Sequence, residues 1–196
     1  MTRYPYLSAL GKAFDLQDYP ALEACTTPHG IAFQADLNEG IPAAMHTCDV
    51  WYGEPPWQAG YEKFAKLADR PEQVKPFAAF MRDLSEQISA ARQPTFLVTG
   101  RHALRHLTPD HVAPLILNGD QAVVAIWRGE PWTQPIDAMD LLVRLASEYE
   151  TIGDFACGLG RAGRVFAAAG KRFVLSDLNA RCVGYIARHA AEWGPE

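Results

Sequence analysis

Three glycines in "GLGRAG", at positions 158, 160 and 163, follow a run of residues that is typical of a strand. Such a turn lets the backbone approach a ligand closely and exposes the positive end of the helix that follows. Asp177 comes 19 residues after Gly158, at the end of the next predicted strand, where its carboxylate can accept ribose hydroxyl protons. We therefore predict a cofactor that contains adenosine, and NAD, FAD and S-adenosylmethionine all meet that requirement.

A second group of residues, Glu54-Pro55-Pro56-Trp57, ends another predicted strand. The Glu54 carboxylate and the Pro55 carbonyl can both accept hydrogen bonds from an exocyclic amine, which localises its lone pair for attack on a sulfonium methyl group. The prolines restrict the backbone that carries these acceptors, and Trp57 can stack on a base. The alternative interpretation is a surface turn with Trp57 packed in the core.

Strands and helices alternate along the chain and can place both groups at one edge of a sheet. The pattern predicts an α/β, Rossmann-like fold with a mostly parallel sheet, a β-hairpin at one edge and helices on both faces. Strands are expected near 31–37, 46–52 and 94–100, and a hairpin around Asn118-Gly119. Helical patterns predict a weak helix over 5–24, one long or broken helix over 61–93 and a helix over 131–150. A strand–turn–helix–strand unit follows over 151–179, and a closing helix begins at 180.

Length and composition point to one domain, since the 196 residues are 48% hydrophobic and contain no low-complexity linker. We assign 1–196 to a single domain, with an N-terminal segment of unassigned role (1–44), a catalytic half (45–130) and a cofactor-binding half (131–196). The net charge of −5 excludes bulk basicity. One local basic cluster, "GRHALRH" at 100–106, is by itself more typical of a solvated loop or helix end.

The four cysteines, at positions 25, 48, 157 and 182, lack the close spacing of a zinc site, so no metal is expected. No basic and apolar leader is present, and no apolar run reaches the roughly 20 residues that a membrane span requires. We therefore expect a cytoplasmic protein that does not bind membranes.

Three blocks together resemble one known family. "CDVWYGEPPW" resembles the catalytic block of S-adenosylmethionine-dependent amino-methyltransferases that act on DNA or RNA, and "GDFACGLGRAG" resembles their cofactor loop. "WTQPIDAMDLLVRL" is similar to the segment that precedes this loop in the permuted, β-type members. The resemblance covers about residues 45 to 190 and has the catalytic block first. It implies methyl transfer to N6 of adenine, or to N4 of cytosine.

The resemblance also implies roles for particular residues. Glu54 and Pro55 would hold the target amine beside Pro56, and Trp57 would stack on the base. The cofactor would be bound by residues from three segments, namely Thr133, Gln134, Asp154, Ala156, Gly158, Gly160, Asp177, Leu178 and Asn179.

Two departures from the family pattern leave alternatives open. Glu54 stands where the family has Asp, Asn or Ser, and no target-recognition region fits between the predicted hairpin and Thr133. A DNA substrate would then need the amino-terminal segment, a second subunit of a homodimer or a specificity subunit for sequence selection; otherwise the substrate is a structured RNA, or is modified with little sequence preference. A non-catalytic subunit that binds a partner or nucleic acid is one alternative function, and an NAD-dependent oxidoreductase is another.

Overall fold

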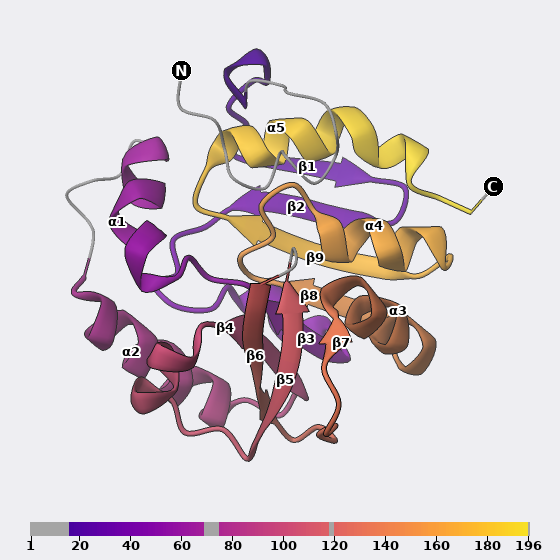
Figure 1. Cartoon of the computed structure of the whole chain (residues 1–196). Helices are drawn as coiled ribbons and strands as arrows, with labels where there is room; N and C mark the ends of the chain where they lie inside the picture. The colour runs from indigo at the N-terminus through magenta and orange to yellow at the C-terminus, as the bar shows by residue number, and fades with distance from the viewer. Residues whose placement is uncertain (1–15, 69–74, 118–119, 196) are drawn as a thin grey trace.

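The computed structural model describes residues 16–68, 75–117 and 120–195, and within them nine strands form one sheet (Figure 1). The strands are β1 (Ala24–Thr27), β2 (Gly30–Gln34), β3 (Val50–Gly53), β4 (Thr95–Thr99), β5 (His111–Leu117), β6 (Asp120–Trp127), β7 (Ile136–Asp137), β8 (Thr151–Asp154) and β9 (Arg172–Asp177). The α-helices are α1 (Gln58–Leu67), α2 (Phe77–Ala90), α3 (Ala138–Glu148), α4 (Arg161–Ala168) and α5 (Ala180–His189). Shorter 3-10 helices are η2 (Leu16–Asp18), η3 (Ala43–Thr47), η5 (Arg101–His106) and η6 (Ala190–Glu192).

The strand order is β1-β2-β9-β8-β3-β4-β6-β5-β7. Its central strands, from β2 through β4, run parallel, and β6 lies antiparallel between β4 and β5. The predicted mostly parallel α/β sheet is therefore confirmed. Strands β5 and β6 also confirm the predicted hairpin, although its turn at Asn118-Gly119 lies outside the described residues.

Helices cover both faces of this sheet, and each face has its own hydrophobic core (Figure 1). On one face, α3, α4 and α5 bury apolar side chains such as Leu141, Phe166 and Ile186. On the other face, α2 packs with strand residues that include Trp51 and Trp127. Helices on both faces were predicted, and the structure confirms them. Among the described residues, no helix is long and apolar enough to cross a membrane.

The N-terminal segment contributes two strands that the sequence pattern did not predict in full. Residues 24–27, expected at the end of a weak helix, form β1, which pairs antiparallel with β2. A tight turn joins them, in which the Gly30 amide donates to Thr27 Oγ1 at 3.1 Å. Gly30 also lets β2 approach β9, because a Cβ there would lie 1.9 Å from the Phe173 carbonyl oxygen. The expected helix over 5–15 lies outside the described residues.

The pattern over 61–93, which predicts one long or broken helix, forms two helices, and Pro76 precedes the second. Two predicted boundaries were wrong. The strand expected from 46 begins at Val50, because η3 occupies 43–47 after Pro42. The helix expected from 131 begins at Ala138, where the Asp137 side chain caps it by accepting from the Met139 amide at 2.8 Å.

Candidate functional site

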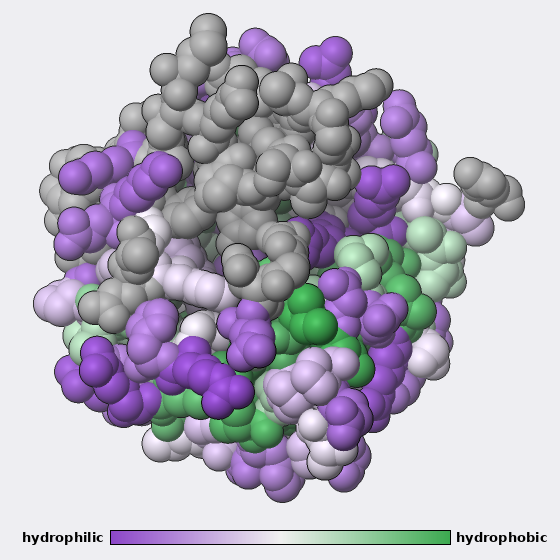
Figure 2. Space-filling model, viewed as in Figure 1, coloured by the Kyte–Doolittle hydropathy of each residue, from purple (hydrophilic) through white to green (hydrophobic). Residues whose placement is uncertain are grey.

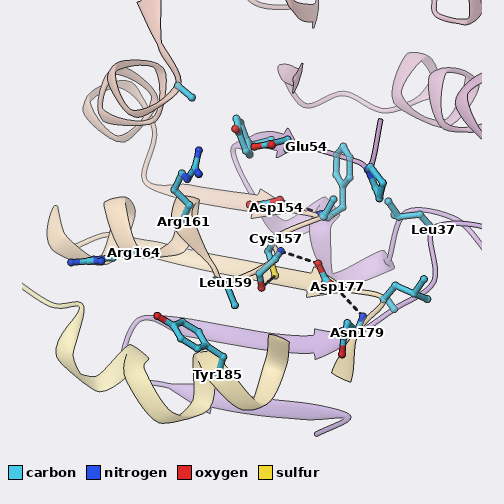
Figure 3. Close-up of a pocket in the computed structure, with 18 of the residues that line it drawn as sticks. Leu37, Glu54, Asp154, Cys157, Leu159, Arg161, Arg164, Asp177, Asn179 and Tyr185 are labelled. Atoms are coloured by element: carbon cyan, nitrogen blue, oxygen red, sulfur yellow. Dashed lines mark hydrogen bonds between the residues drawn. The ribbon is translucent and has the colours of Figure 1, made fainter. Parts of the chain in front are cut away.

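A cavity of about 610 Å³ lies at the carboxyl ends of β2, β9, β8 and β3 (Figure 3). Parallel α/β sheets bind their ligands at this edge, where the chain order reverses, and cavities of about 300–1,000 Å³ suit small molecules and cofactors. The reversal occurs between β8 and β3, because β9 follows β8 on one side and β4 follows β3 on the other. Both predicted groups of residues contribute to this cavity.

The glycine turn joins β8 to α4 and forms one wall of the cavity. Asp154 ends β8 and is 2% exposed, and its Oδ1 accepts a hydrogen bond from the Ala156 amide at 3.1 Å. Gly158 and Gly160 have φ of 51° and 77°, a left-handed backbone that favours glycine. A Cβ at Gly160 would lie 2.6 Å from the Trp193 ring, whereas one at Gly158 would meet no heavy atom within 4 Å. The backbone at Gly158 is therefore open to a ligand.

Asp177 fixes the position of this turn relative to β9. Its Oδ2 accepts from the Gly158 amide at 2.8 Å, and its Oδ1 accepts from the Asn179 amide at 2.9 Å. Asn179 in turn caps α5 by accepting from the Arg181 amide at 3.0 Å. The Leu178 carbonyl accepts from Gln34 Nε2 at 2.9 Å, which links this strand end to β2. Figure 3 shows the side chains of Asp177 and Asn179 side by side at the cavity wall.

The cavity brings several carboxyl groups together. Burial raises the pKa of Asp154 well above its ordinary value, and the charges of Glu54 and Asp177 raise it further. Burial also raises the pKa of Asp177, against the opposing effect of its backbone hydrogen bonds. Arg161 is the nearby cation that lowers the pKa of Asp154. A ligand that carries positive charge would offset the repulsion between these carboxylates.

The second predicted group lies on the opposite wall. Glu54 and Pro56 line the cavity, and Pro55 is buried. The half-buried Trp57 packs against the core beneath α3, α4 and α5, and it is absent from the residues that line the cavity. Its carbonyl accepts from the amides of Gly60 and Tyr61, at 2.7 and 3.0 Å, so the block leads directly into α1.

Two predicted cofactor residues lie away from the others. Thr133 and Gln134 are exposed and do not line the cavity. Residues 137–139, at the start of α3, line it instead. The cause is β7, because its pairing with β5 turns the chain so that the helix end faces the cavity.

The cavity also contains residues that the sequence pattern did not indicate. Residues 35–38 follow β2, and the Tyr61 hydroxyl donates to Asn38 Oδ1 at 3.1 Å. Burial raises the pKa of Tyr61 to about 12, so this hydroxyl stays protonated. The available signal was two polar residues at the end of the predicted strand, Asp36 within it and Asn38 directly after it. On α4, Arg161 and Arg164 also line the cavity, and their signal was a basic residue inside the glycine turn.

Comparison with known proteins identifies the fold. No family model matches the sequence, and no curated protein matches it significantly. TTHA0409 of Thermus thermophilus, named provisionally as a DNA modification methylase, matches with a TM-score of 0.50 at 14% identity, over 84% of this chain and 95% of its own. Its complex with S-adenosyl-L-methionine matches with a TM-score of 0.50 at 13% identity, over 84% of this chain and 94% of its own. M1.HpyAVI matches with a TM-score of 0.48 at 9% identity, over 81% of this chain and 97% of its own.

At these identities the likeness concerns the fold. The chain shares the fold of TTHA0409 over most of both lengths, and the predicted α/β, Rossmann-like fold is confirmed.

Proposed function

We propose that this chain is an S-adenosylmethionine-dependent methyltransferase that modifies the exocyclic amino group of a base in DNA, most simply N6 of adenine. The observation that carries the proposal is the meeting of two blocks, about 100 residues apart in sequence, in one cavity. Glu54 comes from the end of β3, whereas Asp154 and Asp177 come from the ends of β8 and β9. We assign 45–130 to the methyl acceptor and 131–196 chiefly to the cofactor.

The residues of the glycine turn fit this cofactor. Gly158 leaves its backbone open to the ligand, as close approach requires. Asp177 accepts backbone hydrogen bonds from Gly158 and Asn179 and a side-chain hydrogen bond from Cys182, and a carboxylate has about four acceptor sites, so one remains for a ribose hydroxyl. The positive charge of the bound cofactor would favour the ionised form of Asp154, and Arg161 would be a counter-charge for the methionine carboxylate. When bound, the cofactor supplies an electrophilic methyl group.

The opposite wall would hold and activate the amine. The Glu54 carboxylate and the Pro55 carbonyl would each accept one of its hydrogen bonds, which directs the nitrogen lone pair away from the ring. Glu54 would then take the proton that the methylated nitrogen loses and release it to solvent. Trp57 would stack on the base after a side-chain movement, since its ring now packs against the core.

The proposed DNA substrate is supported by the shared fold with TTHA0409 and by the base-directed chemistry of the block after β3. Sequence selection would come from a homodimer or a specificity subunit.

The first experiment is calorimetric titration of the full chain with S-adenosylhomocysteine, with NAD in a parallel titration. We expect saturable micromolar binding of S-adenosylhomocysteine alone. Preferential binding of NAD would contradict the proposal and support an oxidoreductase instead.

The second experiment measures transfer of a labelled methyl group to DNA, with RNA as a separate substrate. We expect labelled DNA from the wild type, and loss of the label in Trp57→Ala with S-adenosylhomocysteine binding retained. Label that persists in Trp57→Ala would contradict the assigned site. Turnover that appears only in Glu54→Asp would support a natural protein that binds without catalysis.

A further inference from the structure

Five basic or imidazole side chains gather on η5 and the adjoining part of α2: Arg82, Arg101, His102, Arg105 and His106. We call this group the basic face. Its three arginines are exposed, and within the described part of the chain none of them forms an ion pair with a carboxylate. Figure 2 shows strongly hydrophilic side chains at the lower left, over α2 and η5. The face is a local exception in a chain of net charge −5.

The fold places this face beside the proposed acceptor block. Strand β4 pairs with β3, so η5, which follows β4, begins at the same edge of the sheet as Glu54. Gly100 precedes η5, and a Cβ on it would lie 3.6 Å from Trp57 Cε3. Gly100 is therefore a direct neighbour of Trp57, and the basic face begins at the next residue, Arg101.

Aromatic contacts connect the face to the cavity wall. The ring of Phe77, at the start of α2, lies 5.6 Å from the ring of Tyr61, which lines the cavity. The same Phe77 ring lies 6.1 Å from His102 and 6.3 Å from His106. One aromatic side chain thus separates the cavity wall from the two histidines.

The face carries uncompensated positive charge. Arg105 Nε donates to His106 Nε2 at 3.1 Å, which requires that ring nitrogen to be unprotonated. The pKa of His106 is lowered by desolvation first and then by the charges of Arg105, Arg82 and His102. A bound anion would relieve the repulsion among these groups.

We propose that the basic face binds the phosphodiester backbone of DNA next to the base that is presented to Glu54. This inference rests on the proposed function and names the surface that holds its substrate. Arginine guanidinium groups match phosphate oxygens in charge and geometry. The two histidines of the face lie one aromatic side chain from the cavity wall, a position that suits a strand whose base has left the stack.

The chain gives a reason for such a surface. The segment between β6 and Thr133 is too short for a target-recognition region, so the basic face supplies binding that does not depend on base sequence. Arginines that contact phosphates carry no direct information on the base sequence. We therefore expect binding of similar strength to oligonucleotides of different sequence, with strong salt dependence.

The test is fluorescence anisotropy of labelled single-stranded DNA with the full chain, from about 0.05 to about 0.5 M salt. The variant is Arg101→Gln with Arg105→Gln. The matched control is Arg92→Gln with Arg172→Gln, which removes two exposed arginines from the amino ends of β4 and β9. Calorimetric titration with S-adenosylhomocysteine on every variant reports the fold and the cofactor site independently.

We expect the Arg101/Arg105 variant to bind DNA on the order of tenfold more weakly at about 0.1 M salt, with the slope of log affinity against log salt reduced by about 1.4, or about 0.7 for each phosphate contact. The control should keep the wild-type slope, and both should keep wild-type S-adenosylhomocysteine affinity. Equal slopes of log affinity against log salt in variant and wild type would overturn the proposed DNA binding by the basic face. Much tighter binding of RNA than of DNA would overturn it as well. If the wild type does not bind S-adenosylhomocysteine, the proposed function itself is overturned.

Discussion

The two walls of the cavity are held in place in different ways. On the glycine-turn side, backbone amides bond to Asp154 and Asp177, and two left-handed glycines set the path of the chain. On the opposite side, the residues after β3 are held by two prolines and by the start of α1. The first wall is fixed by hydrogen bonds from backbone amides to two aspartate side chains, and the second by the restricted backbone of the prolines and by the first turn of α1.

This difference indicates where substitutions should act. Changes in the glycine-turn wall should alter stability and cofactor binding together, because the same hydrogen bonds serve both. Changes in the opposite wall should alter methyl transfer with smaller effects on either. Three experiments test this difference or one wall of it, beginning with the largest expected effect.

The largest effect is expected from Gly160→Ala, compared with Gly170→Ala. Both glycines have left-handed φ, 77° and 71°, which costs an L-residue about 1–2 kcal/mol. A Cβ at Gly160 also lies 2.6 Å from the buried Trp193 ring, whereas one at Gly170 meets nothing within 4 Å. We expect Gly160→Ala to lose a further 1–3 kcal/mol, roughly the cost of overpacking, in urea unfolding. Equal losses at both positions would show that Trp193 does not confine the turn.

The next effect is expected from Asp177→Ala, compared with Glu54→Gln. The first change leaves the Gly158 and Asn179 amides without their acceptor, which should lower the free energy of unfolding by about 1–3 kcal/mol. S-adenosylhomocysteine affinity should fall at least tenfold, which corresponds roughly to the loss of one hydrogen bond to a charged group. Glu54→Gln should change that affinity by less than about threefold while methyl transfer is lost. Equal losses of affinity in the two variants would break the contrast between the walls.

The smallest effect concerns pH and the buried carboxyl of Asp154. Its folded-state pKa is raised by burial and by neighbouring carboxylates, so the folded chain holds this proton more tightly than the unfolded chain. Its contribution to stability is therefore full below the unfolded value of about 3.9 and is lost as pH rises through the folded-state pKa. Asp154→Asn should flatten this decline, as measured by urea midpoints from acid to neutral pH. An unchanged decline in the variant would assign the pH dependence to other groups.

The residues that could be predicted from sequence depend on local rules. The turn between β8 and α4 was foreseen because left-handed backbone and close approach favour glycine, and Asp177 because it ends the next strand. The β5–β6 pairing followed from two apolar runs joined by a short turn signal. These features need only a few consecutive residues, so they are visible without the fold.

The remaining features needed the folded chain. Strand β2 joins β9 through hydrogen bonds between segments more than 140 residues apart, and this pairing brings residues 35–38 to the cavity. Whether Thr133 or Asp137 faces the cavity depends on the pairing of β7 with β5. The basic face lies beside Glu54 only because β4 pairs with β3. The sequence alone determined the candidate residues of each block, whereas tertiary structure decided which blocks share a cavity, because long-range strand pairing leaves no local signal.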